Sequence, residues 1–345
     1  MPVRTLIVDD SPTMRAAPMT SISGSAERMC FSAAPEPHAA RQMIKELDPD
    51  VLTLDVEMPG MDGLSFLEKI MRLRPMPVVM CSTLTAHGAD ATIEALRIGA
   101  VDFVTKPNAS ADAIMREGPA LCRKVRQAAR SHVRRARGRA VDRPALKPAA
   151  GHGRGQLIAI GASTGGVESL FDFLPALPAD MPPIVIVQHM PGGFTNSFAQ
   201  RLDRVSALHV EEATNGAPLK RGTVYIAPGG AEHLEVVGGA AGHVRLRSGE
   251  PVSGHRPSVD VLFHSVAPLG AASIGLILTG MGADGADGLR AMRTAGARTL
   301  GQSEDSCVVY GMPKAAAELG AVEKELSLAA MPEALLGILA GKNGS

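Results

Sequence analysis

The chain has 345 residues, of which 45% are hydrophobic and 3% aromatic, and its 35 basic and 35 acidic side chains give a formal net charge of +0. This length predicts two domains, and the ordinary apolar share allows each a sizeable core filled by aliphatic side chains and Met. The four cysteines lack the spacing of a metal site, no apolar run reaches the ~20 residues of a membrane span, and no signal peptide is visible, so we expect a cytoplasmic protein without membrane insertion.

Apolar runs alternate with helical patterns over the first third of the chain. The expected strands are residues 3–8, 51–54, 77–81 and 101–104, and two of the expected helices are residues 63–73 and 89–98. Because strands that alternate with helices pair in parallel, this pattern predicts a parallel sheet with helices on both faces.

Charged and polar side chains stand where these strands end. Asp9 and Asp10 follow the first strand, Asp55 follows the second, Ser82 the third and Lys106 the fourth. Three neighbouring carboxylates repel one another unless a cation neutralises them, and Mg²⁺ prefers such oxygen ligands. A carboxylate beside that metal can attack a phosphoryl donor to form an acyl phosphate. The alternative is that these acids only cap the helices that follow them.

Three motifs in this part of the chain resemble a response-regulator receiver domain. They are Val8-Asp9-Asp10-Ser11, the run from Asp55 to Gly63, and Lys106-Pro107. The resemblance implies a flavodoxin-like (βα)5 domain over residues 1–122, in which Asp55 accepts a phosphoryl group from a sensor histidine kinase.

The same resemblance assigns supporting roles around the phosphoacceptor. Asp10, Asp55 and the backbone carbonyl of Glu57 would bind Mg²⁺ directly, and Asp9 would bind it through water. The other supporting residues are Lys106 and the switch positions Ser82 and Phe103.

One region departs from the receiver pattern. Pro18 falls inside the expected first helix, where a proline costs ~3 kcal/mol and kinks the helix. Residues 27–37 should hold the second strand, but they contain only a short apolar run followed closely by Pro35 and Pro37. We therefore expect a bent first helix and a weak second strand.

Arginine and lysine crowd the middle of the chain, where large apolar residues are scarce. Residues 111–129 can complete the last helix of the first domain, and we expect residues 123–153 to form an extended basic linker. Binding to nucleic acid or to an anionic membrane is the alternative. We expect no nucleic-acid partner, because no aromatic side chain interleaves the charges and no helix-turn-helix pattern follows.

The second domain, expected over residues 154–345, opens with an apolar strand at residues 157–160. The run Gly-Ala-Ser-Thr-Gly-Gly follows at residues 161–166, and apolar residues then recur at helical spacing. Ser163 therefore lies in a tight turn between a strand and a helix, where helix N–H groups can face a reacting group. Turns of this kind also bind phosphates and dinucleotides, so the motif alone leaves the chemistry open.

Two further apolar strands end at residues that complete a Ser/His/Asp set. His189 ends the run at residues 184–189, and Asp284 follows the run at residues 274–279 after a glycine-containing turn. Because the carboxyl ends of parallel strands lie at one edge of a sheet, the three side chains can converge. The alternatives are a serine that caps a helix, a histidine packed in the core, and an aspartate that caps a helix after a flexible loop.

The rest of the second domain shows the same alternation of strands, helices and glycine-rich turns. A strand is expected at residues 223–227, a hairpin at 233–237 and 243–247, and helices at 257–269 and 289–295. The sequence thus predicts an α/β protein whose second domain is a doubly wound, mainly parallel sheet with a small antiparallel hairpin. The other histidines of this domain are expected to be surface or core residues; they are His209, His233, His243, His255 and His264.

Residues 161–165 fit the G-x-S-x-G motif of α/β-hydrolases, but in that fold the acid precedes the histidine, whereas here it follows. The second domain instead resembles the chemotaxis protein-glutamate methylesterases of the CheB type, in which a receiver domain also precedes the catalytic domain. The motifs that carry this resemblance are Gly161 to Gly166, Gln188-His189-Met190, Tyr225 to Gly229, Arg256 to Asp260 and Thr279 to Gly285.

This resemblance implies a phosphorylation-regulated serine hydrolase. It would demethylate glutamate methyl esters, with release of methanol, and deamidate glutamines on cytoplasmic helices of methyl-accepting chemoreceptors, with the chemotaxis histidine kinase as phosphodonor. Ser163 would be the nucleophile, His189 the general base and Asp284 the group that orients the base. Backbone N–H groups of Met281 and Thr164 would hold the oxyanion, and the esterase chemistry needs no metal.

Two other classes of function stay open at this point. The second domain could be a docking module without catalysis, or the protein could be a DNA-binding response regulator that uses its basic linker. Replacement of Ser163 by Ala separates a docking module from an esterase, and salt-dependent DNA affinity would favour the DNA-binding protein. In an esterase, we expect the receiver to limit access of a receptor helix to Ser163 until Asp55 is phosphorylated.

Overall fold

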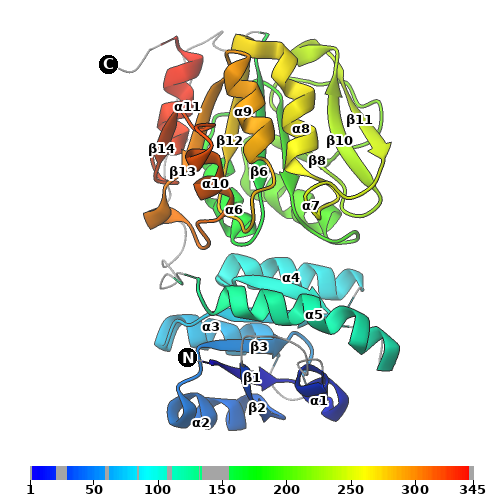
Figure 1. Ribbon diagram of the computed structural model, residues 1–345, viewed down its shortest axis with the longest axis vertical. Helices are drawn as coiled ribbons and strands as arrows, with labels where there is room; N and C mark the ends of the chain where they lie inside the picture. The colour runs from blue at the N-terminus through cyan, green and yellow to red at the C-terminus, as the bar shows by residue number, and fades with distance from the viewer. Residues whose placement is uncertain are drawn as a thin grey trace. The chain divides into compact units, whose positions relative to one another are not determined.

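The computed structural model describes residues 2–20, 29–58, 62–83, 85–106, 111–131, 133 and 155–341. Contacts divide the chain into two compact units, Met1–Gly138 and Arg139–Ser345, which are drawn in Figure 1. Among the described residues, no helix is long and apolar enough to cross a membrane.

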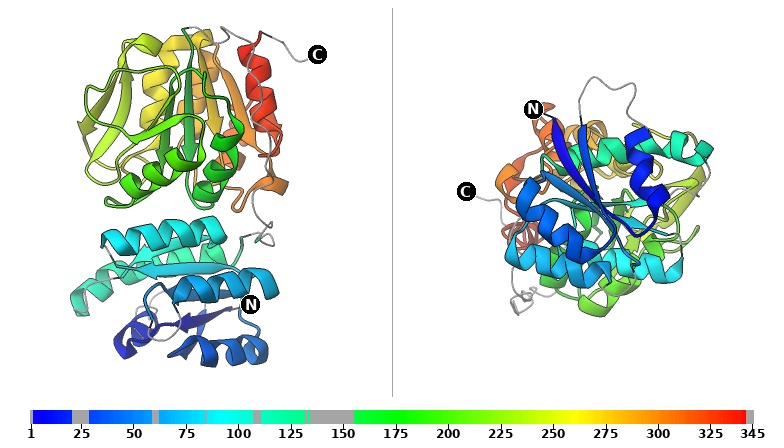
Figure 2. Two further views of the ribbon diagram at one scale, coloured as in Figure 1. Left: turned by 180° about the vertical axis from the view of Figure 1, so that it is seen from behind. Right: turned by 90° about the horizontal axis from the view of Figure 1, so that it is seen from below.

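The N-terminal unit is built around one parallel sheet with the strand order β2-β1-β3-β4-β5. Within the described residues its strands are β1 (Val3–Val8), β2 (Met29–Ala34), β3 (Val51–Asp55), β4 (Val78–Ser82) and β5 (Asp102–Thr105). The helices between and after them are α1 (Pro12–Thr20), α2 (Pro37–Leu47), α3 (Gly63–Leu73), α4 (Ala86–Ile98) and α5 (Ala111–Ala128). Helix α1 contacts α5 and helix α3 contacts α4, and Figure 2 shows helices on both faces of the sheet. The parallel α/β arrangement predicted for this unit is confirmed.

The central strands of this sheet hold polar side chains at one edge. Every residue of β3 and β4 is buried, as is typical of parallel strands with helices on both sides. Helix α3 begins where Asp62 accepts a hydrogen bond from the Ser65 N–H (2.6 Å), and α4 begins where Thr85 accepts one from the Gly88 N–H (3.0 Å). These caps fix where each helix leaves the carboxyl edge of the sheet.

The second strand is present at full length, and its expected weakness stays a prediction. Strand β2 has six residues and pairs with β1 along its whole length, from Val3 opposite Met29 to Val8 opposite Ala34. An edge strand needs only one hydrogen-bonded neighbour, which β1 supplies. The prolines lie beyond the strand, and Pro37 occupies the first turn of α2, where its missing N–H costs nothing. The predicted bend of α1 at Pro18 stays a prediction.

Helix α5 crosses the domain boundary predicted at residue 122 and ends at Ala128. The ammonium group of Lys124 bonds to the Asp102 carboxylate (2.8 Å) and to the backbone carbonyl of Phe103 (2.7 Å), both in β5. The start of the basic stretch is therefore helical and packs on the N-terminal sheet. Most of the expected linker, residue 132 and residues 134–153, lies outside the described residues.

The C-terminal unit contains a larger sheet in which each strand pairs in parallel with its neighbours, in the order β14-β13-β12-β6-β7-β9-β8. Within the described residues its strands are β6 (Leu157–Ala162), β7 (Ile184–Gln188), β8 (His209–Glu212), β9 (Thr223–Ile226), β12 (Ser273–Ile277), β13 (Arg298–Gln302) and β14 (Lys324–Leu326). A separate antiparallel hairpin pairs β10 (Glu232–Val237) with β11 (His243–Ser248). The predicted doubly wound sheet with a small hairpin is confirmed.

Helices cover this sheet as well. The α-helices are α6 (Gly166–Phe173), α7 (Thr195–Val205), α8 (Val259–Val266), α9 (Ala286–Thr294), α10 (Met312–Glu318) and α11 (Met331–Leu339), and short 3₁₀ turns lie at Leu174–Ala176, Gly239–Ala241, Ala267–Ala272 and Glu304–Ser306. Helices α8, α9 and α10 contact one another in sequence order, and Figure 1 shows α8 beside α9. The helix expected at residues 257–269 is shorter than predicted, because it gives way to a 3₁₀ turn after Val266 in which Gly270 has φ +49°.

The direction of chain winding marks where a site can form in this unit. From the central strand β6 the chain moves to β7, then to the edge strand β8 and back to β9 on one side, and it later passes to β12, β13 and β14 on the other. Ligand sites in open parallel sheets form at the carboxyl ends of the strands where the winding reverses. Here that place lies beyond β6 and β12, which are entirely buried.

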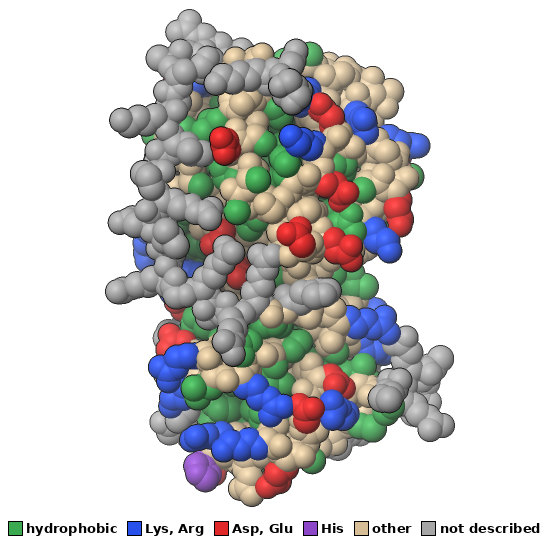
Figure 3. All heavy atoms as spheres, turned by 90° about the vertical axis from the view of Figure 1, so that its left-hand side faces the viewer, with side chains coloured by type: hydrophobic (Ala, Val, Ile, Leu, Met, Phe, Trp, Pro, Cys, Tyr) green, Lys and Arg blue, Asp and Glu red, His purple; other side chains and the backbone are tan. Residues whose placement is uncertain are grey.

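The exposed surface carries charges of both signs. On the face shown in Figure 3, Lys and Arg side chains are interspersed with Asp and Glu among uncharged and apolar side chains in each unit. On this face the described residues form no large single-sign patch. This distribution does not by itself indicate a binding site.

Strand β6 packs closely against helix α8 at Gly161. A Cβ atom at Gly161, in β6, would lie 2.2 Å from Cγ1 of Val259, the first residue of α8. We expect Gly161→Ala to lower the free energy of unfolding of the C-terminal unit by about 1–3 kcal/mol, because α8 must shift. Thermal unfolding of the full chain measures this change.

A matched glycine provides the control. Gly337 lies within α11, and no atom other than those of its chain neighbours and the nearby helix backbone lies within 4 Å of a Cβ built there. Gly337→Ala is therefore expected to leave the melting temperature unchanged or to raise it, since alanine favours helix by roughly 0.5–1 kcal/mol. Equal melting temperatures for the two variants would contradict the close packing of β6 against α8.

Candidate active site

Ser163 lies in the turn that joins β6 to α6. The carbonyl of Ser163 accepts a hydrogen bond from the Gly166 N–H (2.8 Å), which closes the turn, and Gly165 has φ +77°. A side chain at Gly165 would also collide with Val308, since its Cβ would lie 2.5 Å from the valine Cβ. Glycine is therefore required there, both for its backbone conformation and for space.

Strand register places His189 beside Ser163. Ala162 of β6 pairs with Gln188 of β7, and the His189 N–H donates to the Ala162 carbonyl (3.0 Å), so the next residues of the two strands are neighbours. The buried amide of Gln188 ties the two strand ends together. Its Nε2 donates to the carbonyl of Ser163 (2.9 Å) and to that of His189 (3.1 Å).

The loop after β12 completes the same edge. The Ser163 N–H donates to the Thr279 carbonyl (3.1 Å), and a Cβ built at Gly280 would lie 2.8 Å from the Cβ of Ser163. The loop then returns Asp284 to His189, with 2.7 Å between Asp284 Oδ2 and His189 Nε2. The structure thus brings Ser163, His189 and Asp284 to one edge of the sheet.

The carboxylate of Asp284 is buried and sits at the start of α8. It accepts hydrogen bonds from the Ser258 hydroxyl (2.7 Å), the Val259 N–H (2.8 Å) and the Asp260 N–H (3.0 Å), in addition to the imidazole. Burial opposes ionisation most strongly, but the bonds from His189, Ser258 and Val259 outweigh it and lower the pKa of Asp284 to about 2. Asp284 is therefore a fixed negative charge against one ring nitrogen of His189.

The orientation of the His189 ring leaves Nδ1 as its possible proton acceptor. Nε2 is engaged by Asp284, whereas Nδ1 is buried and has no hydrogen-bond partner among the described residues. In the serine-protease template Nδ1 faces the aspartate and Nε2 faces the serine. His189 therefore has the same role here, but with its two ring nitrogens exchanged. No hydrogen bond joins Ser163 to Nδ1 among the described residues, and such contacts often tighten only in a substrate complex.

Backbone constraints orient the peptide groups next to Ser163. The Gly280 carbonyl accepts bonds from the Gly311 N–H (3.1 Å) and the Met312 N–H (2.8 Å), so the N–H of Met281, in the same trans peptide, points to the opposite side. The Thr279 hydroxyl donates to the Thr164 carbonyl (3.0 Å) and holds that residue in the turn. Met281 and Thr164 therefore lie on the two segments that flank Ser163, as an oxyanion site would need.

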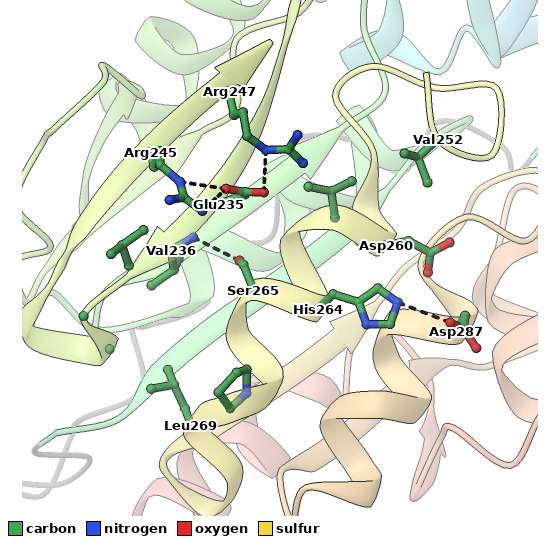
Figure 4. A pocket seen from close by; sticks show the side chains of 15 residues that line it. Glu235, Val236, Arg245, Arg247, Val252, Asp260, His264, Ser265, Leu269 and Asp287 are labelled. Atoms are coloured by element: carbon green, nitrogen blue, oxygen red, sulfur yellow. Dashed lines mark hydrogen bonds and ion pairs between the residues drawn. The ribbon is translucent and has the colours of Figure 1, made fainter. Parts of the chain in front are cut away.

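The hairpin β10–β11 supports α8, the helix whose start binds Asp284. Figure 4 shows Glu235 of β10 between Arg245 and Arg247 of β11, with N–O distances of 2.8 and 2.9 Å. The Ser265 hydroxyl of α8 accepts a hydrogen bond from the Val236 N–H of β10 (2.9 Å). On the same helix, Nε2 of His264 lies 3.2 Å from Oδ2 of Asp287 in α9. An open groove remains between hairpin and helix.

Three residues of this site had no assigned role in the sequence interpretation. Ser258 is fully buried against Asp284, Gln188 ties the strand ends, and His255 stacks on His189, although His255 was expected to be an ordinary surface or core residue. The position of Ser258 just before an apolar helix is a helix N-cap signal and could have indicated its capping role. No sequence pattern indicates the stacking of two histidines from distant segments.

The receiver unit brings together the predicted acidic residues. One carboxylate oxygen from each of Asp9, Asp10 and Asp55 lies within 4.8 Å of the others. The ammonium group of Lys106 lies 2.5 Å from Asp55 Oδ2 and 3.1 Å from Asp9 Oδ2. Burial raises the pKa of Asp55, and Lys106 only partly opposes this.

This receiver pocket fits a hard divalent cation. Among the described residues, the three carboxylates face the ammonium group of Lys106, and the Arg15 guanidinium donates to the Asp9 and Asp10 carbonyls (2.8 and 2.9 Å). Three carboxylates against two cations still leave excess negative charge at a site composed of oxygen ligands. The Glu57 N–H donates to Asp55 Oδ1 (3.1 Å), which places the Glu57 backbone beside the cluster.

The two predicted switch residues are both buried. The Ser82 hydroxyl donates to the Gly88 carbonyl of α4 (3.1 Å). The ammonium nitrogen of Lys124 lies over the buried ring of Phe103, 5.3 Å from the centroid of that ring. Their proposed roles in phosphorylation stay predictions.

Comparisons with known proteins agree with this geometry. The sequence matches the CheB methylesterase family over residues 158–335 and the response regulator receiver domain family over residues 5–116. It is 53% identical to protein-glutamate methylesterase/protein-glutamine glutaminase 1 of Caulobacter vibrioides over 341 residues, which are 99% of each chain. The chain belongs to the CheB methylesterase family.

Other CheB relatives give the same result. The protein-glutamate methylesterase/protein-glutamine glutaminase of Rhizobium etli is 53% identical over 342 residues, 99% of this chain and 98% of that one. The crystal structure of the Thermotoga maritima CheB methylesterase catalytic domain matches with a TM-score of 0.51 and 40% identity, and the match covers 53% of this chain and 98% of that chain.

The charge state of Asp284 can be tested against Asp260 in the same site. Asp284 should stay ionised down to about pH 2, whereas burial and the nearby Asp284 charge raise the pKa of Asp260. Carboxyl ¹³C chemical shifts recorded against pH should therefore show Asp260 titrating well above Asp284. The stabilisation that Asp284 provides is complete above about pH 4 and is lost as the pH falls towards 2. A titration of Asp284 above pH 4 would refute this arrangement.

Proposed function

We propose that this protein is a phosphorylation-regulated protein-glutamate methylesterase and protein-glutamine glutaminase. It would act on methylated glutamates and on glutamines of chemoreceptor helices in chemotaxis. The observation that carries the proposal is the buried Asp284–His189 pair at 2.7 Å beside Ser163, at the edge where the winding of the sheet reverses. The relatives that match along their full length are named for these two activities.

The proposed reaction is acyl transfer through Ser163. His189 takes the proton of the Ser163 hydroxyl on Nδ1, and the oxygen attacks the carbonyl carbon of the glutamyl ester. Asp284 stabilises the imidazolium that forms. The protonated ring then gives its proton to the departing methoxide, and methanol leaves. Water, activated by the same imidazole, hydrolyses the acyl-enzyme and releases glutamate.

The oxyanion of each tetrahedral intermediate would be held by the backbone N–H groups of Met281 and Thr164. These donors cost no reorganisation, because the Gly280 and Ser163 carbonyls, which lie in the same peptide groups as these N–H groups, are already fixed by other hydrogen bonds. The same steps hydrolyse a glutamine amide, with ammonia as the leaving group. A non-catalytic docking module is not favoured as the function of this unit, since it gives no role to the buried hydrogen bond between Asp284 and His189.

In the receiver, we assign Asp55 as the phosphoacceptor. Asp10, Asp55 and the Glu57 carbonyl would hold Mg²⁺, with Asp9 acting through water; the ion would screen the charge of an incoming phosphoryl group. Lys106, Ser82 and Phe103 would support the phosphorylated state. The phosphodonor would be a chemotaxis histidine kinase, and the working compartment would be the cytoplasm.

The domain assignment follows from these roles. We assign residues 1–122 to the receiver, 123–153 to the linker and 154–345 to the hydrolase. Helix α5 runs on to Ala128, so the first residues assigned to the linker are helical. We propose that phosphorylation relieves a restriction that the receiver places on access to Ser163.

Replacement of Ser163 tests the chemistry. The full-length protein should release radiolabelled methanol from membranes that carry a chemoreceptor with labelled methyl esters. Ser163→Ala should lower the rate of this release by at least ~10⁴-fold, since the nucleophile is absent. Ser248→Ala is the matched control, because Ser248 is exposed on β11, and its rate should equal that of the wild type. Methanol release by Ser163→Ala at the wild-type rate would exclude the proposed reaction.

Replacement of Asp55 tests the regulation. A small-molecule phosphodonor with Mg²⁺ should raise the rate of methanol release by the wild type, and Asp55→Asn should show no such rise. Chelation of Mg²⁺ by EDTA should abolish the rise in the wild type as well. A rise that persists in Asp55→Asn would place the phosphoacceptor elsewhere.

A further inference from the structure

The ring of His189 is stacked on the ring of a second histidine, His255. The ring centroids are 3.7 Å apart and the planes differ by only 7°. His255 comes from the segment between β11 and α8, whereas His189 follows β7, so strand pairing alone does not require this contact. The stack lies in the candidate active site, on the residue assigned as the general base.

The loop that carries His255 is held firmly. Val252 and His255 exchange two backbone hydrogen bonds, of 3.0 and 2.9 Å, across a two-residue turn. The central residues Ser253 and Gly254 have φ +52° and +78°, the left-handed conformations of a tight hairpin turn. The backbone of His255 is therefore held in a closed turn and not in a long flexible loop.

The next residue anchors this turn to the rest of the domain. The guanidinium of Arg256 donates to the Gly230 carbonyl (2.8 Å) and to the Gly249 carbonyl (2.6 Å). Two residues further on, Ser258 caps α8 and bonds to Asp284. A single short segment thus contacts both the imidazole, through His255, and its carboxylate partner, through Ser258.

The geometry of the stack limits what His255 can do chemically. Imidazole N–H groups and lone pairs lie in the ring plane, so two parallel rings cannot pass a proton directly to each other. His255 can instead block rotation of the His189 ring and cover one of its faces. The hydrogen bond to Asp284 alone fixes one ring nitrogen and leaves the ring able to turn about that contact.

We propose that His255 is a positioning residue for the general base. Its ring holds the plane of His189 so that Nε2 stays on Asp284 while Nδ1 keeps one direction for the proton of Ser163. It also excludes water from one face of the imidazole, which strengthens the attraction between the imidazolium and Asp284. This inference rests on the proposed function of Ser163 and His189.

Three variants of the full-length protein test the proposal with methylated-receptor membranes as substrate. His255→Ala should lower kcat for methanol release by about 10- to 100-fold with KM changed less than about threefold, because a misplaced base slows the chemical step. His255→Phe keeps a flat ring without nitrogen and should return kcat to within about threefold of the wild type. His243→Ala is the control, since His243 is exposed on β11, and it should match the wild type.

The outcomes separate the inference from the proposed function. Wild-type kcat in His255→Ala would overturn the positioning role. So would a kcat in His255→Phe as low as in His255→Ala, because the ring nitrogens would then matter. A rise in KM with unchanged kcat would place His255 in substrate binding and would also overturn it. If Ser163→Ala and His189→Ala both kept wild-type activity, the proposed function itself would fail.

Discussion

The ionised carboxylate of Asp284 is the group on which the arrangement of the catalytic domain depends. Only 1% of its surface is exposed, and a charge at that depth is costly unless donors surround it. Four hydrogen bonds do so: one from His189, one from Ser258 and two from the first N–H groups of α8. The carboxylate therefore fixes the general base and the start of α8 together, and loss of either partner would leave the buried charge with fewer donors.

Close packing makes this electrostatic arrangement possible. A Cβ at Gly161 or at Gly285 would come within about 2.5 Å of Val259, and a Cβ at Gly280 would come within 3 Å of Ser163. Glycine at these three places lets a strand, a loop and a helix approach until backbone N–H groups reach the buried oxygens. The sheet supplies the rest, since register alone puts Ser163 beside His189. Function then depends on the same contacts that stabilise the domain.

Much of the fold and the convergence of the three candidate catalytic residues could be predicted from the sequence. The strands that carry the site are continuous apolar runs, and their polar ends share one edge of the sheet. Other parts could not. The edge strands β8 and β14 have four and three residues and include charged side chains, so neither shows an apolar pattern. The full length of strand β2 could not be predicted, because its pairing with β1 is a tertiary contact. Two of the four donors to Asp284 are backbone N–H groups, and the His255 stack depends on the path of a loop, so the residue pattern indicates neither.

The central claim is that Asp284, through His189, activates one serine among all those in the chain. Treatment with a fluorophosphonate, followed by peptide mass spectrometry, tests this claim without a receptor substrate. The account predicts a single adduct on Ser163 in the wild-type protein, formed much more slowly in Asp284→Asn. An adduct on another serine, or equal labelling rates in the two proteins, would contradict it.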